Sequence, residues 1–301
     1  MIPLTRKKKE EYIASLESAA NSHGQWRDIV GRLLRNKLGV VGMTIVVVLL
    51  ILVVFAPVFT KYPYDQQSFP NRFKYPGMTY LLGTDNFGRD LWSRLLYGGR
   101  ISLLVSVVAV CLSMGIGTIL GSTAGYFGGK VDTIIMRILD ILMAIPHLLL
   151  CIAISAMLGS GPMRTALAIS ISGIASASRI IRSTVMSIKG NEFVEAARAT
   201  GSTHLRVIFR HILPNTIAPL IVDSTLRIGA NIMLISSLSF IGLGVQPPIP
   251  EWGSILSAGR DYIRDFWPMT VFPGLFIMLT LFGFNLFGDA LRDALDPKLK
   301  N

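Results

Sequence analysis

Charged residues are scarce in this chain of 301 residues: Asp, Glu, Lys and Arg together make up 16% of it, against about 25% in soluble domains. Hydrophobic residues make up 51%, and the mean hydropathy is +0.54. This composition argues against a disordered chain and against an ordinary cytosolic enzyme. The net charge is nonetheless +11, and an apolar chain that is also basic fits either an integral membrane protein or a nucleic-acid binder.

Residues that carry catalysis or bind metals are also few. The chain has two cysteines and four histidines. Cys111 and Cys151 both lie inside apolar runs, where packing explains them better than a disulfide, and the histidines lack the spacing of a zinc site. The nearest candidate for a phosphate-binding loop, Gly129-Lys130, is followed by Val131 instead of Ser or Thr. We therefore expect no catalytic residue, no metal site and no cofactor bound by this chain, which disfavours an intramembrane enzyme.

Six apolar runs are long enough to cross a bilayer core of about 30 Å as helices. Backbone polar groups in lipid must pair within their own segment, and a β-barrel would need alternating segments of about ten residues instead of continuous runs. The sequence therefore predicts an all-α polytopic membrane protein with six transmembrane helices. The predicted spans are 38–59, 101–126, 134–158, 163–181, 217–245 and 268–287. The first run is about twice as long as a signal-peptide core, so we expect it to remain as an anchor.

The distribution of Lys and Arg predicts the orientation of these spans. With six spans both termini lie on one side, and that side would carry about twice as many basic residues as the other. Because cytoplasmic loops carry such an excess, we expect both termini in the cytoplasm. The net positive charge is then explained largely by the orientation of the chain in the membrane. No basic face is interleaved with stacking aromatics, so we expect no nucleic-acid partner.

Polar segments outside the spans offer candidate surfaces. Before the first span, apolar residues recur at helical spacing, which predicts a helix in the cytoplasmic interface; they are Trp26, Ile29, Val30, Leu33 and Leu34. The outer segment 61–100 contains 'LLGTDNFGRD', which favours a turn. After the fifth span, three prolines precede a short predicted helix over 251–263, whose tryptophans we expect at headgroup depth. A structured cap and simple anchoring are the favoured interpretations of these outer segments. The alternative is a docking or gating surface that would use Asp85, Phe87, Arg89, Asp90 and Trp252.

The cytoplasmic segment 188–215 is the most informative part of the sequence. It predicts a helix over 191–200 that Gly201 ends, and a second helix over 204–212 that Ser202 or Thr203 caps. Small residues would let another protein approach the first helix closely; they are Ala196, Ala197 and Ala199. Two short helices joined at a glycine would form a rigid knob for a cytoplasmic partner. The alternative is an ordinary amphipathic segment that leads into the next span.

Charged residues also occur within or beside the predicted spans. Asp223 and Arg227 are four residues apart, and Arg137 and Asp140 are three apart, so each couple can pair on one helix face. Intramembrane charges normally face a bundle interior or an aqueous cavity. A polar path or gate is one interpretation. The favoured one is that these pairs fix helix packing near the cytoplasmic boundary.

Several motifs along the chain resemble those of a known family. Glu195-Ala196-Ala197, followed by Gly201 and then by Leu213-Pro214, resembles the EAA loop of ABC importer permeases. His211 departs from that loop, which usually has an apolar residue there. Four other stretches are similar to the dipeptide/oligopeptide/nickel permease family, specifically its C-type subunit: 'LLGTDNFGRDLWSRLLYGGRISLL', 'AGYFGGKVDTIIMRILDILMAIP', 'SFIGLGVQPPIPEWG' and 'GDALRDALDPKLK'.

The resemblance implies a type I ABC importer permease fold in a bacterial or archaeal plasma membrane. In that family the EAA loop is a coupling helix that docks into the ATP-hydrolysing subunit, which implies ATPase-coupling roles for Glu195, Ala196, Ala197, Gly201, Leu213 and Pro214. The implied partners are a homologous B-type permease, two ABC ATPase subunits that would hold ATP and Mg, an extracytoplasmic substrate-binding protein and the lipid bilayer.

The resulting organisation has five parts. It comprises a cytoplasmic N-tail with an interfacial amphipathic helix at 1–37, a first transmembrane helix at 38–60, an extracytoplasmic segment at 61–97, an ABC permease core at 98–290 with five transmembrane helices and a coupling loop at 189–214, and a cytoplasmic tail at 291–301. The implied cargo is a dipeptide or oligopeptide, with nickel chelate, glutathione or another small peptide-like solute as alternatives. An exporter is less favoured because of the import-type loop, and a self-sufficient channel or carrier is the rival from another class.

Overall fold

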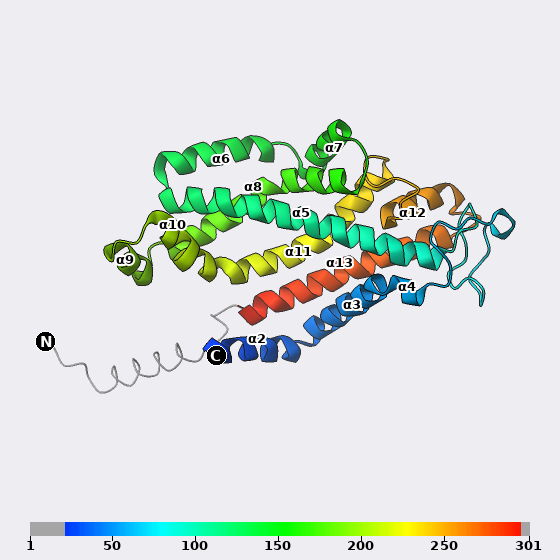
Figure 1. The fold of residues 1–301 in the computed structure, drawn as a ribbon, viewed down its shortest axis with the longest axis horizontal. Helices are drawn as coiled ribbons and strands as arrows, with labels where there is room; N and C mark the ends of the chain where they lie inside the picture. Colours follow the sequence, from blue (N-terminus) through cyan, green and yellow to red (C-terminus); the bar gives the residue numbers. More distant parts are fainter. Residues whose placement is uncertain (1–21, 296–301) are drawn as a thin grey trace.

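The computed structural model describes residues 22–295, and within them every regular element is helical. The one β-type contact in this range is an isolated bridge between Thr84 and Asp90. The all-α prediction is confirmed for this part of the chain. Predictions for the first 21 residues and for the tail beyond Leu295 lie outside the described residues. Figure 1 shows long helices side by side along the longest axis, with α9 and α10 at one end and α12 at the other.

The helices follow one another with short connections, except before α5 and between α11 and α13. Their bounds are α2 Ser22–Arg35, α3 Lys37–Val54, α4 Ala56–Phe59, the 3-10 turn η1 Phe69–Asn71, α5 Leu91–Phe127, α6 Gly129–Met143, α7 His147–Leu158, α8 Pro162–Ile188, α9 Glu192–Ala199, α10 His204–Arg206, the π-helical turn η2 Val207–Ile212, α11 Leu213–Phe240, α12 Trp252–Gly259, the 3-10 turn η3 Arg260–Tyr262 and α13 Pro268–Leu295.

Four helical stretches of the described chain are long and apolar enough to cross a membrane: α3, α5, the run His204–Phe240 and α13. A bent pair, α6 with α7, provides a fifth if it counts as one span. The predicted span 163–181 lies on α8, whose serines and arginines lower its hydropathy. The number of six spans therefore stays a prediction.

α8 packs closely along α5, and glycines of α5 permit this contact. A Cβ atom on Gly121 would lie 2.4 Å from the carbonyl oxygen of Ser178, and one on Gly125 would lie 2.9 Å from that of Arg182. Either contact is too short for a side chain, so the two backbones approach where only hydrogen fits. These two glycines therefore permit the close packing of α5 against α8.

The third predicted span is not a continuous helix. α6 and α7 meet at an angle of 84° across a break of a few residues. Pro146 causes the break, because proline has no N–H to donate and disfavours helical backbone at the residue before it. The prediction of a single continuous helix over 134–158 was therefore wrong.

The fifth span begins earlier than the sequence predicted. One helical run extends from His204 through the π-helical turn into α11, without a break between the predicted second short helix and the span. Pro214 does not interrupt it, because this proline closely follows the π-helical turn η2, where the hydrogen-bond pattern already departs from that of an α-helix. α10 is thus rigidly joined to a membrane helix.

α12 is held by buried residues at the end of the bundle opposite to α9, which is called the outer end because the sequence predicts it to be extracytoplasmic. Trp252 is fully buried, packs against Phe276 and donates its indole N–H to the carbonyl oxygen of Leu95 at 2.8 Å. The prediction of a short helix here is confirmed. The side chain of Trp252 fills the core between α5 and α13 and does not face outward as an interface anchor would, whereas its depth in the membrane stays a prediction.

Glu251, the residue that caps α12, is also fully buried. Its carboxylate accepts hydrogen bonds from the Ser254 amide at 2.9 Å and from the Ser102 hydroxyl of α5 at 3.0 Å. Loss of hydration on burial raises the pKa of the Glu251 carboxyl, although these hydrogen bonds act in the opposite direction.

We expect Glu251→Gln to flatten the dependence of stability on pH. The folded chain holds the Glu251 proton more tightly than the unfolded chain does, so its contribution to the free energy of unfolding falls as pH rises above about 4.5. Glutamine cannot titrate and loses this term. Thermal unfolding of both proteins in detergent between pH 4.5 and 7.5 tests this, and an equal decline in the two would contradict it.

α2 lies against the end of α13. Leu33 packs against Ala290 and Ala294, with Ile29 at the edge of the same cluster. The predicted helix before the first span is confirmed. Its place in the membrane interface stays a prediction.

Candidate functional site

The segment between α8 and α11 contains the separate short helix α9, as the sequence predicted, while the predicted second helix continues into α11 as one helical run. Val194 and Ala197 point from α9 into a core cluster that contains Val207, Ile208 and Ile212. This packing fixes the orientation of α9 against the start of the fifth span. Ala197 therefore does not belong to an exposed small-residue surface, and that part of the prediction was wrong. Ala196 and Ala199 remain exposed.

The exposed face of this segment carries charge and large apolar side chains. Glu195 lies on it beside Ala196, and neither packs into the core. Phe193, Leu205 and Phe209 are 41%, 66% and 63% exposed. Sequence reasoning missed these three, although large apolar residues in a polar segment are a signal that a partner covers them.

Gly201 makes the turn between α9 and α10. Its φ is +80°, a conformation that side-chain-bearing residues rarely adopt. An added Cβ would meet nothing within 4 Å, so the glycine is needed for its backbone and not for space. Thr203 caps α10 by accepting a hydrogen bond from the Arg206 amide. Leu213 and Pro214 form the first turn of α11, with Pro214 exposed.

The end of α5 holds this segment from the other side. The Tyr126 hydroxyl lies 2.9 Å from Nδ1 of His204, and the Arg198 guanidinium lies 4.9 Å from the centre of the Tyr126 ring. Lys189 donates to the carbonyl oxygen of Gly125 at 2.9 Å. A movement of α9 would therefore reach α5 as well as α11. These contacts join residues up to 78 positions apart, so no local pattern could predict them.

Of the two predicted ion pairs, one forms in the structure and the other does not. Arg227 and Asp223 form an ion pair along α11 at 2.5 Å. Asp140 pairs with Arg179 of α8 at 2.6 Å instead of with Arg137. α8 runs beside α6 and offers Asp140 a partner across the helix interface. The predicted pair within α6 was therefore wrong.

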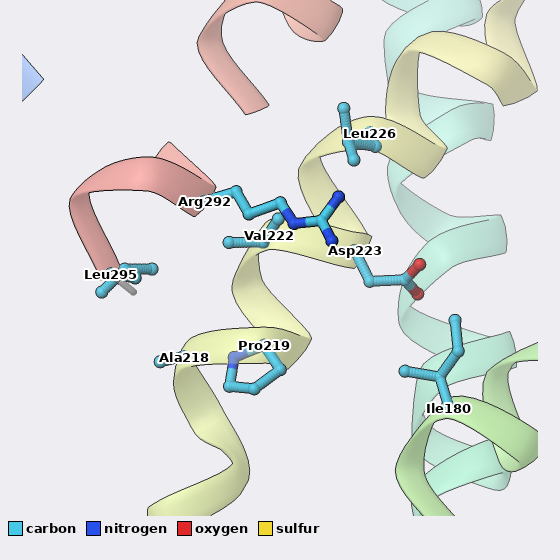
Figure 2. Close-up of a pocket in the computed structure, with 8 residues that line it drawn as sticks. All are labelled: Ile180, Ala218, Pro219, Val222, Asp223, Leu226, Arg292 and Leu295. Atoms are coloured by element: carbon cyan, nitrogen blue, oxygen red, sulfur yellow. The ribbon is translucent and has the colours of Figure 1, made fainter. Parts of the chain in front are cut away.

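Asp223 also lines a cavity of about 410 Å³ between α11, α8 and the end of α13. Figure 2 shows Arg292 reaching from α13 across this space toward α11, while the carboxylate of Asp223 turns toward Ile180. Apolar residues form the rest of the wall: Ala218, Pro219, Val222, Leu226 and Leu295. Because the Asp223 carboxylate is already paired with Arg227, this cavity has little free charge apart from Arg292.

The candidate outer docking residues are mostly buried. The Asp85 carboxylate accepts from the Phe87 and Arg89 amides, pairs with the Arg89 side chain at 2.6 Å and lies 3.5 Å from Arg94. Phe87 is 39% exposed and lies under the Arg89 guanidinium. The predicted turn is confirmed, and its buried ion pairs stabilise the cap.

Asp90 caps α5 by accepting hydrogen bonds from the amide and hydroxyl of Ser93. Burial raises the pKa of its carboxyl, and the bonds from Ser93 partly oppose that shift. Like Asp85 and Trp252, it stabilises the fold at the outer end. Of the proposed outer surface residues, Phe87 is the one with a side chain available to a partner.

Metal ligands do not gather in the described part of the chain: no group of three or more His, Cys, Asp or Glu side chains lies close enough to hold an ion. Cys111 is exposed and Cys151 is buried, and both are free thiols.

Two family profiles match the chain. The profile described as the binding-protein-dependent transport system inner membrane component matches residues 117–301. The profile described as the N-terminal TM domain of oligopeptide transport permease C matches residues 24–76.

Curated relatives cover nearly the whole chain. A dipeptide transport system permease protein of Alkalihalophilus pseudofirmus is 44% identical over 92% of this chain and 91% of its own length. An oligopeptide transport system permease protein of Bacillus subtilis is 40% identical, over 91% and 90% of the two chains. A glutathione transport system permease protein of Pectobacterium atrosepticum is 41% identical over 92% of each.

A solved structure shares the fold. A chain of the MetNI methionine ABC transporter in an inward-facing conformation superposes with a TM-score of 0.56 and 16% identity, over 68% of this chain and 98% of that one. At that identity the likeness establishes the fold alone.

Proposed function

Because this chain belongs to the family of binding-protein-dependent transport system inner membrane components, we propose that it is one of two transmembrane permease subunits of an ATP-driven importer of dipeptides or oligopeptides. The observation that carries the coupling part of this proposal is α9. Its inner face packs into the core while Glu195, Ala196 and Phe193 face outward. ATPase subunits would dock there, and their closure would move α5 and α11 through the contacts of Tyr126 and the continuous helix from His204.

In this account the chain itself is non-catalytic, and ATP and Mg bind to the ATPase subunits. A homologous permease would complete the translocation path, and an extracytoplasmic binding protein would deliver the cargo. The full arrangement would have six transmembrane helices, with α8 crossing as the fourth, and both termini in the cytoplasm. The excess of basic residues on that side supports this orientation.

Reconstitution tests the proposed function. The chain and its partner subunits are placed in proteoliposomes with the binding protein outside and ATP inside. We expect peptide uptake that depends on ATP and on every subunit. Uptake by the chain alone would instead support a self-sufficient channel or carrier.

Glutathione is the second candidate cargo, because relatives named for glutathione transport match this chain at 41% identity. The first residue of glutathione is joined to the next through its side-chain carboxyl, so glutathione has a free α-amino acid group at an end where a dipeptide has only an amino group. The two cargoes therefore compete for uptake only if one binding protein accepts both. Mass analysis of the ligand that copurifies with the binding protein distinguishes the two cargoes and also identifies any nickel chelate.

We expect Glu195→Lys to lower ATP-dependent uptake at least about tenfold without preventing insertion into the membrane. The carboxylate is exposed on α9, so reversing its charge changes the docking face and leaves the core intact, and lost complementarity at an interface costs several kcal/mol. The matched control is Asp289→Lys, which makes the same charge change at an exposed site on α13. Equal uptake by the two variants would contradict a role for Glu195 in coupling.

A further inference from the structure

A second cavity, of about 490 Å³, lies where α6 and α7 break apart. Its wall combines the break, one face of α8 and one face of α11. The residues that line it are Leu142, Met143, Ile145, Pro146, His147, Leu150, Ser172, Ser176, Arg227, Ala230, Asn231 and Leu234. Its volume lies within the range of about 300–1,000 Å³ that is typical of small-ligand sites.

Hydrogen-bond donors converge on this cavity. The Arg227 guanidinium donates to Ser176 at 3.0 Å and to Asp223, which neutralises its charge. These two bonds engage Nε and Nη1, and Nη2 has no partner within the described chain. The ring of His147 lies 3.0 Å from the Ser172 hydroxyl through Nε2. Because Asp223 neutralises the charge of Arg227, this ion pair makes the cavity polar without adding a net charge.

The first turn of α7 borders the same cavity through His147 and Leu150. Leu150 is the first residue of this helix whose amide pairs, with the carbonyl of Pro146, and no side chain caps the turn. The amides of His147, Leu148 and Leu149 therefore lack acceptors among the described residues. Free amides at the start of a 12-residue helix favour an acceptor oxygen, because the helix dipole is positive there.

Asn231 provides an independent observation. It is only 8% exposed and lines the cavity from α11, yet its side-chain amide makes no hydrogen bond to any described residue. Asn86, Ser155 and Thr270 hold the buried side-chain atoms that lack a partner in the described chain, and Asn231 is not among them, so its amide reaches the open space of the cavity. A break in a helix at membrane depth is tolerated where it faces water or a polar ligand. Both features are explained if a ligand or water with acceptor oxygens occupies the cavity during the transport cycle.

We propose that this cavity is a cargo-contact site of the translocation path, which binds the carbonyl and carboxylate oxygens of a short peptide through Asn231, Arg227 and the first amides of α7. The inference rests on the proposed function and deepens it by assigning where this subunit touches its cargo. The site recognises groups that every peptide has, so it contacts the peptide backbone and leaves side-chain selectivity to the binding protein.

The test uses the complete transporter in proteoliposomes and a dipeptide with a photoreactive side chain. We expect light-dependent labelling within 142–150 or 227–234 of this chain in the wild-type complex, and competition by unlabelled dipeptide. Asn231→Leu, which removes the amide at similar size, should lower labelling and the rate of uptake about fivefold to tenfold. ATP hydrolysis stimulated by the loaded binding protein should stay within about twofold of wild type.

Two further variants make the result specific. Asn231→Asp places a negative charge among acceptor oxygens and should lower uptake more than Asn231→Leu does. Ser237→Ala is the matched control on the same helix, because its hydroxyl is exposed and bonds only to the carbonyl of Met233, and it should take up peptide like the wild type. Thermal unfolding in detergent identifies any variant that is simply misfolded.

Labelling that falls only on the partner permease, in a wild-type complex that takes up peptide, would overturn this inference alone. Unchanged uptake by Asn231→Leu would overturn it as well. A wild-type complex without ATP-dependent uptake would overturn the proposed function and this inference together.

Discussion

Replacing Gly201 with tryptophan is expected to reduce ATP-dependent peptide uptake by the assembled transporter by about tenfold or more. The left-handed backbone at this position, with φ at +80°, costs a residue with a side chain roughly 1–2 kcal/mol. Relief of that strain would change the direction of α10 relative to α9, and the indole would stand on the exposed side of the turn. Uptake into proteoliposomes and ATP hydrolysis, measured on the same preparation, check the result.

Gly190 provides the matched control for this substitution. It lies at the other end of α9 and is exposed, and a Cβ atom added there would meet nothing within 4 Å, but its φ is not positive. We expect Gly190→Trp to insert and fold like Gly201→Trp and to lose less uptake. Normal uptake by a Gly201→Trp complex would contradict the proposed coupling role of this turn.

Replacing Trp252 with alanine is expected to lower the free energy of unfolding by about 3–5 kcal/mol, the usual cost of removing a large buried aromatic side chain. Trp252 is fully buried, packs against Phe276 and bonds to the carbonyl of Leu95. Its loss would leave a cavity between α12, α5 and α13 and would remove the hydrogen bond that joins α12 to α5. Denaturant unfolding of the purified chain in detergent measures the effect.

The matched control is Trp267→Ala. Trp267 is 44% exposed and packs beside Phe272 near the start of α13, so its removal should cost clearly less than that of Trp252. Equal destabilisation by the two changes would mean that the outer end is not organised around Trp252. Trp252→Ala should also slow uptake, because it loosens the outer end of α5.

The sequence predicted those parts of the fold that depend on local patterns. Apolar runs marked α3, α5 and α13, and Gly201 with Thr203 marked the turn between α9 and α10. These features follow from periodicity, from capping and from the backbone that glycine allows. The short helix α12 was also predicted, from the segment that follows the three prolines, and Glu251 caps it in the structure.

Predictions that depended on tertiary neighbours were less successful. Trp252 was expected at the membrane interface because tryptophan favours that depth, but the side chain is buried by helices distant in sequence. Asp140 was expected to pair within its own helix, and Arg179 of α8 pairs with it instead. Spacing along one helix shows which partners are within reach, whereas packing between helices decides which partner is bound.

The candidate site also combines features that follow from local sequence patterns with features that depend on tertiary packing. The exposed positions of Glu195 and Ala196 follow from helical periodicity once α9 is recognised. The burial of Ala197, the contact between Tyr126 and His204 and the polar cavity around Asn231 arise from the meeting of distant segments. Pro146 did carry a local signal for the break that opens this cavity, since proline rarely lies within a straight helix.

Photocrosslinking from position 196 tests the central claim most directly. A photoreactive amino acid at Ala196, in the exposed middle of α9, is compared with the same residue at Thr133, an exposed position on α6. The account predicts a crosslink from position 196 to an ATPase subunit, with a yield that changes between the nucleotide-free and ATP-bound complex, and none from position 133. A complex that takes up peptide with ATP but gives no crosslink to the ATPase from position 196 would contradict it.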